Sequence, residues 1–131
     1  MTSNILADTS IWIEFFKHGS KIGDKLAELI MKNSICTCGV VLFELVQGVK
    51  TENEKDLVSD TLSNLEYFEM SVSLWEKAGE ISAKLKKNGL NLPLSDIFIA
   101  AICLEHNLSI FTLDKHFEQI PKVKVYKVYN V

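Results

Sequence analysis

The stretch that decides the fold is ILADTSIWIEFF, residues 5–16. Its first three residues are apolar and form a run of strand length. Asp8 ends this run, and bulky apolar residues from Ile11 to Phe16 then recur at helical spacing. The pattern predicts a short buried strand that turns directly into a helix, with a carboxylate at the corner.

The same alternation continues along the whole chain. Strands are predicted over residues 4–7, 35–38, 67–70, 109–113 and 122–129, and helices over residues 9–16, 21–31, 40–49, 51–65, 72–88, 94–106 and 115–120. The helix over residues 94–106 has almost no polar face, so it should be packed on several sides. Strands that alternate with helices predict a three-layer α/β/α fold with a central, mostly parallel sheet of about five strands.

Length and composition predict one globular domain spanning residues 1–131. Hydrophobic residues make up 47% of the chain and charged residues 24%, which excludes a disordered chain and a disulfide-stapled miniprotein. The longest uncharged runs are much shorter than the roughly 20 residues of a membrane-spanning helix. The N-terminus lacks the basic region of a signal peptide, so we expect a cytoplasmic protein without a membrane partner.

Cysteine usage and charge exclude further classes. The three cysteines form no Cys-x-x-Cys pair, which argues against disulfides and structural zinc and predicts reduced, buried thiols. All 14 basic residues are lysine, although sequence-specific reading of duplex DNA depends strongly on arginine. The net charge of −3 gives no indication of a nucleic-acid-binding protein.

Four carboxylates interrupt hydrophobic segments, and this placement is energetically costly: Asp8, Glu44, Asp96 and Asp114. Two follow predicted strands, and two lie in the early turns of helices that begin at the same sheet edge, where ligands bind in open α/β sheets. Without basic partners the four would repel one another, and a divalent cation would relieve this repulsion. Carboxylate oxygens suit Mg²⁺ or Mn²⁺ better than zinc.

A purely structural alternative exists for three of these acids. Asp8, Asp96 and Asp114 lie at or beside predicted helix starts, where each could cap backbone N–H groups. Capping does not explain Glu44, which lies within a helix, and it does not predict that all four acids gather at one edge. We therefore favour a metal site.

The sequence resembles a PIN-domain ribonuclease, and in size and layout it is similar to the VapC-type toxins of prokaryotic toxin–antitoxin pairs. The resemblance spans nearly the whole chain. It is carried, in order, by ILADTS at residues 5–10, FEL at 43–45, LSDIFIAA at 94–101 and FTLDKHF at 111–117.

This resemblance implies metal-dependent cleavage of RNA phosphodiester bonds by a PIN-like fold. The acidic cluster would be Asp8, Glu44, Asp96 and Asp114, with Ser10 and Thr112 as supporting polar groups and Lys115 and His116 as candidate RNA contacts. A cation held by Asp8 and Asp96 would activate water and stabilise charge on the phosphate, and Glu44 or Asp114 would orient the water, accept its proton or hold a second metal. The resemblance also implies a homodimer, with the apolar first helix as a candidate surface, and an antitoxin that covers the acidic pocket.

Other functions remain open at this stage. The nearest alternative is a PIN nuclease of RNA processing with no antitoxin. A receiver-like module that binds Mg²⁺ and accepts a phosphoryl group would also use an acidic pocket, but here Asp8 is followed by Thr9 and Ser10 rather than by a second acid. The same segment lacks the second aspartate of the haloacid dehalogenase phosphatases. A degenerate PIN fold that only binds a partner would leave the four acids unexplained.

Overall fold

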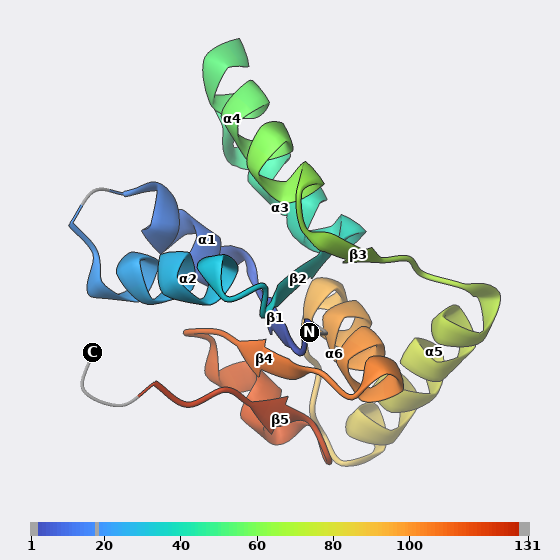
Figure 1. The fold of residues 1–131 in the computed structure, drawn as a ribbon. Helices are drawn as coiled ribbons and strands as arrows, with labels where there is room; N and C mark the ends of the chain where they lie inside the picture. Colours follow the sequence, from blue (N-terminus) through green and yellow to red (C-terminus); the bar gives the residue numbers. More distant parts are fainter. Residues whose placement is uncertain (1–2, 18, 129–131) are drawn as a thin grey trace.

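A computed structural model describes residues 3–17 and 19–128, and its centre is one parallel sheet (Figure 1). The strand order is β3-β2-β1-β4-β5, and every neighbouring pair is parallel, as the sequence predicts. The strands are β1 (Ile5–Ala7), β2 (Ile35–Cys38), β3 (Glu66–Phe68), β4 (Ser109–Phe111) and β5 (Lys124–Val125). All five therefore end at the same edge of the sheet.

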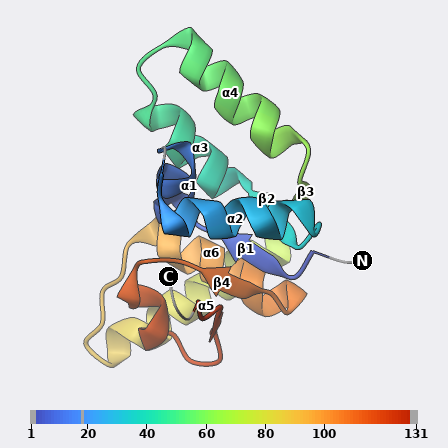
Figure 2. The same ribbon diagram turned by 60° about the vertical axis from the view of Figure 1, so that its left-hand side comes forward.

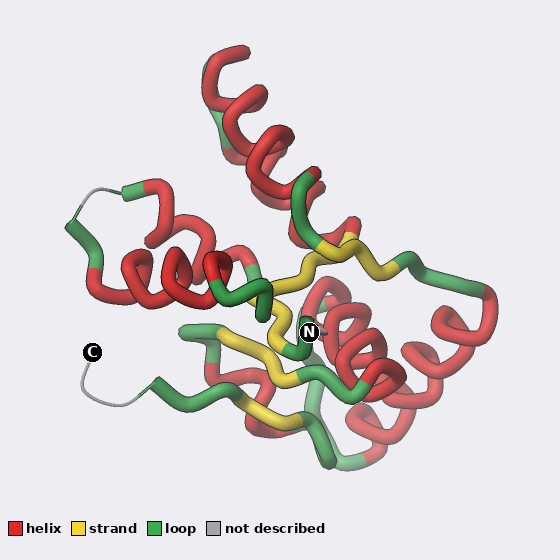
Figure 3. The backbone as a smooth tube through the Cα atoms, in the orientation of Figure 1, coloured by secondary structure: helices red, strands yellow, loops and turns green. Residues whose placement is uncertain are grey.

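Helices cover both faces of this sheet, which makes the fold a three-layer α/β/α arrangement. Helices α1 (Thr9–Phe16) and α2 (Lys21–Met31) lie on one side, and α5 (Val72–Lys87) and α6 (Leu94–His106) lie on the other (Figure 2). Helices α3 (Gly39–Gly48) and α4 (Glu52–Ser63) form a hairpin that extends away from the sheet. A 3₁₀ helix, η1 (Lys115–Gln119), follows β4. Figure 3 shows the short strands side by side between the helices.

The core explains why the central strands lack polar alternation. Every residue of β1 and β2 is buried because helices cover both sheet faces. In α6 seven consecutive or near-consecutive residues from Asp96 to Cys103 are buried, which confirms the prediction that this helix is packed on several sides. Among them is one carboxylate, Asp96, whose place in the fold positions the site described below.

The three thiols are free and buried, as predicted. Burial raises the pKa of the Cys36 thiol to about 12 and raises the pKa of Cys38 and Cys103 as well. The thiolate forms are thus strongly disfavoured. Within the described residues 3–17 and 19–128, no helix is long and apolar enough to cross a membrane.

Several predicted elements differ from the structure. The strand predicted over residues 109–113 ends at Phe111, and the helix predicted over residues 115–120 is the 3₁₀ helix η1. The two edge strands also differ from their predicted bounds. The predicted strand over residues 67–70 begins one residue earlier and ends at Phe68. The last strand pairs only over Lys124–Val125 rather than over residues 122–129, of which residue 129 lies outside the described residues. Each edge strand has a partner on one side only, so its length depends on where that pairing stops and not on its own apolar pattern.

Candidate active site

The four isolated carboxylates meet at the edge where the parallel strands end. Asp8 follows β1, Asp114 follows β4 by three residues, Glu44 lies in α3 after β2, and Asp96 lies in the first turn of α6. All four line one cavity of about 320 Å³, together with Thr9, Ser10, Pro93, Ser95 and Ile99. The structure thus brings together the whole predicted acidic cluster.

Asp8 is the most tightly held of the four. Its side chain caps α1 by accepting from the backbone N–H groups of Ser10 and Ile11, and it is only 6% exposed. The hydroxyls of Ser10 and Thr112, both predicted as supporting groups, also donate to its two oxygens. Burial raises the pKa of Asp8, and these hydrogen bonds partly oppose the rise. The network fixes the orientation of the two carboxylate oxygens of Asp8 in the lining of the cavity.

The same network joins the two turns that carry Asp8 and Asp114. The backbone N–H of Asp114 donates to Thr112 Oγ1 at 2.9 Å, and the N–H of Leu113 donates to Ser10 Oγ at 3.1 Å. Asp114 in turn caps η1 by accepting from the backbone N–H of His116 at 2.9 Å. These hydrogen bonds between the two turns therefore fix the separation between Asp8 and Asp114, the first and last acids of the cluster.

His116 lies between two of the carboxylates. Its Nδ1 is 2.9 Å from Oδ2 of Asp96 and 3.1 Å from Oδ1 of Asp114. The hydrogen bond to Asp96 raises the pKa of His116, and the Asp114 carboxylate raises it further. Burial raises the pKa of Asp96, which is 7% exposed, although the contact with His116 opposes the rise.

Glu44 lines the cavity from α3 and is more exposed than Asp8 and Asp96. The sequence predicts that its carboxylate points toward packed structure, but the residue is half-buried, because α3 leads away from the sheet into the projecting hairpin. Its Oε1 accepts a 2.6 Å hydrogen bond from Thr9 Oγ1. Glu44 also lines the two neighbouring cavities, so it stands where three surface hollows meet.

The capping alternative accounts for only part of the cluster. Asp8 and Asp114 are N-caps, as that interpretation requires. Helix α6, however, begins after Pro93 with no side-chain cap, so Asp96 caps nothing. Asp96 and Glu44 therefore occupy the cavity without a structural role of this kind.

The donor set fits a divalent cation. Ligand atoms of Asp96, Asp114 and His116 all lie within 4.8 Å of one another, and the oxygens of Asp8 and Glu44 face the same cavity. Across residues 3–17 and 19–128, none of the four carboxylates pairs with a lysine. The carboxylate oxygens suit Mg²⁺ or Mn²⁺, and a bound cation would offset the repulsion that burial intensifies.

The sequence does not predict the place of Thr9 in the site or the contacts of His116 with two of the carboxylates. Thr9 was not singled out, although its place next to Asp8 in the first turn of a helix is a usable signal. His116, a candidate RNA contact in the sequence, has its ring nitrogen within hydrogen-bond distance of Asp96 and Asp114 in the structure. Its position two residues after Asp114 could have suggested a ligand pair. Lys115 is exposed at the start of η1.

Comparison with known proteins identifies the family of this chain. The model of the PIN domain family matches residues 5–123, nearly the full chain. The chain belongs to the PIN domain family. It is 37% identical to Ribonuclease VapC3 of Methanocaldococcus jannaschii over 95 residues, which cover 72% of this chain and 93% of that protein.

Solved structures of other proteins share the fold of this chain. The chain matches VapBC2 from Rickettsia felis, solved bound to a DNA fragment from its promoter, with a TM-score of 0.78 and 26% identity over 93% of this chain and 96% of the other. It also matches DNA-bound VapBC from Salmonella typhimurium, with a TM-score of 0.82 and 23% identity over 96% and 98%. Because the chain belongs to the PIN family, the receiver-like and phosphatase alternatives are excluded. The sheet order agrees, because receiver domains have the order 2-1-3-4-5 rather than 3-2-1-4-5.

Proposed function

We propose that this chain is a Mg²⁺- or Mn²⁺-dependent endoribonuclease and the toxin of a VapBC-type toxin–antitoxin pair. The observation that carries the proposal is the convergence of Asp8, Glu44, Asp96 and Asp114 on one cavity in a PIN domain. The similarity to proteins named as VapC ribonucleases and to VapBC complexes supports the toxin assignment. The reaction is hydrolysis of an RNA phosphodiester bond.

Each carboxylate has a distinct place in this proposal. Asp8, Asp96 and Asp114 hold the cation, with His116 as a further ligand or as the group that occupies its place in the free protein. When bound, the cation supplies stabilisation of the negative charge that develops on the phosphate and lowers the pKa of water. Ser10 and Thr112 keep Asp8 oriented by donating to its oxygens. Glu44, which lines the same cavity from α3, would orient the attacking water and accept its proton.

The proposal extends to the rest of the molecule. Residues 1–131 act as one nuclease domain in the cytoplasm, with RNA as substrate. An antitoxin would block the site by covering the acidic cavity, and a basic side chain of that partner would neutralise the carboxylates. The homodimer implied by the resemblance also remains a proposal. In the predicted association helix, α1, the structure buries Ile11 and Trp12 and leaves Ile13 exposed.

Expression in bacterial cells tests the toxin assignment. Inducing the chain alone should arrest growth, and Asp96→Asn should restore growth at equal protein level. A small protein encoded beside this gene should co-purify with the chain and relieve the arrest. A PIN nuclease of RNA processing, the remaining alternative, would show neither arrest nor such a partner.

A further inference from the structure

Glu44 is held at the acidic cavity differently from the three aspartates. Asp8 and Asp114 cap helices with their side chains, and Asp96 is buried in the first turn of α6. Glu44 lies in α3, the first helix of the projecting hairpin, and it lines two further cavities besides the acidic one. Its side chain has room to turn toward each of these hollows, so a specific contact is needed to keep the carboxylate at the acidic one.

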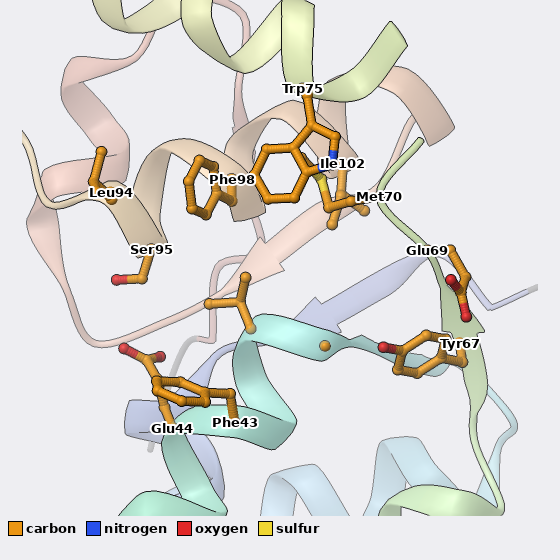
Figure 4. A pocket seen from close by; sticks show the side chains of 12 residues that line it. Phe43, Glu44, Tyr67, Glu69, Met70, Trp75, Leu94, Ser95, Phe98 and Ile102 are labelled. Atoms are coloured by element: carbon orange, nitrogen blue, oxygen red, sulfur yellow. The ribbon is translucent and has the colours of Figure 1, made fainter. Parts of the chain in front are cut away.

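One hydrogen bond provides this contact. Thr9 Oγ1 donates to Oε1 of Glu44 at 2.6 Å. Within residues 3–17 and 19–128, it is the only side-chain hydrogen bond that joins α3 to another element of the fold. Figure 4 shows Glu44 beside a groove with aromatic walls, with its carboxylate directed toward Ser95, which also lines the acidic cavity. The bond to Thr9 therefore holds the Glu44 carboxylate at the acidic cavity.

The donor of this hydrogen bond is itself rigidly placed. Thr9 is the first residue of α1 and directly follows Asp8, whose side chain caps the helix by accepting from the N–H groups of Ser10 and Ile11. The threonine side chain is also branched at Cβ, which restricts rotation about χ1. The hydroxyl of Thr9 is thereby fixed relative to the Asp8 carboxylate, and Glu44 is fixed relative to both.

We propose that Thr9 is a positioning residue, which holds Glu44 where it activates the attacking water. This inference rests on the proposed ribonuclease function. In that reaction the water oxygen bonds to phosphorus and its proton passes to Glu44, while the P–O bond to the leaving ribose oxygen breaks and that oxygen takes a proton from solvent. Thr9 occupies Oε1, and Oε2 has no hydrogen-bond partner in the part of the chain that the structure describes, so Oε2 accepts the proton.

Thr9→Val tests this role because it removes the hydroxyl and keeps the shape of the side chain. The maximal single-turnover rate of RNA cleavage should fall about tenfold, the size of a hydrogen bond to a charged group. The protein concentration at half-maximal rate and the Kd for Mn²⁺ should change by less than about twofold, because Thr9 acts only through Glu44. Thr9→Ser restores the donor and should recover most of the rate.

A matched control and a double variant separate positioning from a structural effect. Thr61→Val makes the same exchange in α4, outside the acidic cavity, and should leave the rate unchanged. Glu44→Gln removes the proton acceptor, so adding Thr9→Val to it should slow cleavage by less than about twofold further. Denaturant unfolding in EDTA checks that every variant is folded.

The outcomes that would overturn the proposal are distinguishable. An unchanged rate in Thr9→Val, or a loss that Thr9→Ser does not recover, would refute the positioning role while the ribonuclease function would stand. A further loss of about tenfold on adding Thr9→Val to Glu44→Gln would show that Thr9 does not act through Glu44. A higher Kd for Mn²⁺ that accounts for the slower cleavage would assign Thr9 to metal binding instead. Absence of metal-dependent cleavage of any RNA by the wild type would refute the proposed function, and this role with it.

Discussion

At the scale of single residues, the same side chains serve the fold and the site. Asp8 caps α1, accepts from Thr112 and so joins the turns after β1 and β4, yet it also lines the acidic cavity. A buried carboxylate that only capped a helix would be replaceable by a neutral acceptor. Asparagine is as good an N-cap as aspartate, so one substitution separates the two roles.

We predict that Asp8→Asn folds in EDTA with a free energy of unfolding no lower than that of the wild type. The variant keeps the capping acceptor and removes a carboxyl group whose pKa is raised by burial. Mg²⁺ or Mn²⁺ at ten times its Kd should stabilise the wild type by about 1.4 kcal/mol and the variant by clearly less. Denaturant titration with and without metal measures both quantities. Asp24→Asn, an exposed acid of α2, is the control, and equal stabilisation of Asp8→Asn and wild type would refute the metal role.

The contacts of His116 predict a pH-dependent contribution to stability. The pKa of His116 is raised in the folded state by Asp96 and Asp114, so folding favours the protonated ring. That contribution is complete below the unfolded value of about 6.5 and is lost as the pH rises through the higher folded value. In EDTA, the difference in Tm between wild type and His116→Gln should therefore be largest at acidic pH and shrink toward alkaline pH.

His106→Gln is the matched control for this measurement. His106 stacks on Phe68 at the end of α6, so its replacement leaves the contact between His116 and Asp96 in place. The pH dependence should persist in this variant. A constant Tm difference between wild type and His116→Gln across the pH range would contradict the ion-pair assignment.

At the scale of elements, the sequence predicts helices better than strand ends. The bounds of α1, α2 and α6 agree with their sequence patterns because apolar periodicity and capping residues such as Asp8 and Ser20 are local signals. The ends of β3, β4 and β5 depend on pairing with distant segments, which no local pattern encodes. The site divides in the same way. Strand ends and sequence order predict the four acids, but the contacts of Thr9 and His116 exist only after folding.

Two helical glycines differ in the space around them, so alanine substitution should affect stability in opposite directions. A Cβ at Gly23 of α2 would lie 2.6 Å from the backbone oxygen of Glu14 and 2.9 Å from Cα of Phe15, so α1 and α2 approach each other there without room for a side chain. Gly23→Ala should cost roughly 1–3 kcal/mol of stability through overpacking. Gly79 lies within α5, exposed and with open space around it, so Gly79→Ala should stabilise the fold by about 0.5–1 kcal/mol. Denaturant unfolding measures both changes, and a neutral Gly23→Ala would contradict this packing.

At the scale of the whole molecule, the parallel sheet creates the site. Because every strand runs in the same direction, the turns after β1 and β4 and the start of α3 after β2 meet at one edge, and α6 begins beside them. The result is an acidic cavity with an aromatic groove along one wall. The central claim is that this cavity cleaves RNA with the help of a divalent cation.

Cleavage of a mixed pool of structured and single-stranded RNA tests that claim most directly. Purified wild type, Asp96→Asn and the control Asp24→Asn are each incubated with the pool in Mn²⁺, Mg²⁺ or EDTA, and the cut ends are mapped by sequencing. We predict discrete cuts by the wild type and by Asp24→Asn in either metal, none in EDTA, and none above background for Asp96→Asn. The same cuts produced by Asp96→Asn, or by the wild type in EDTA, would contradict the account.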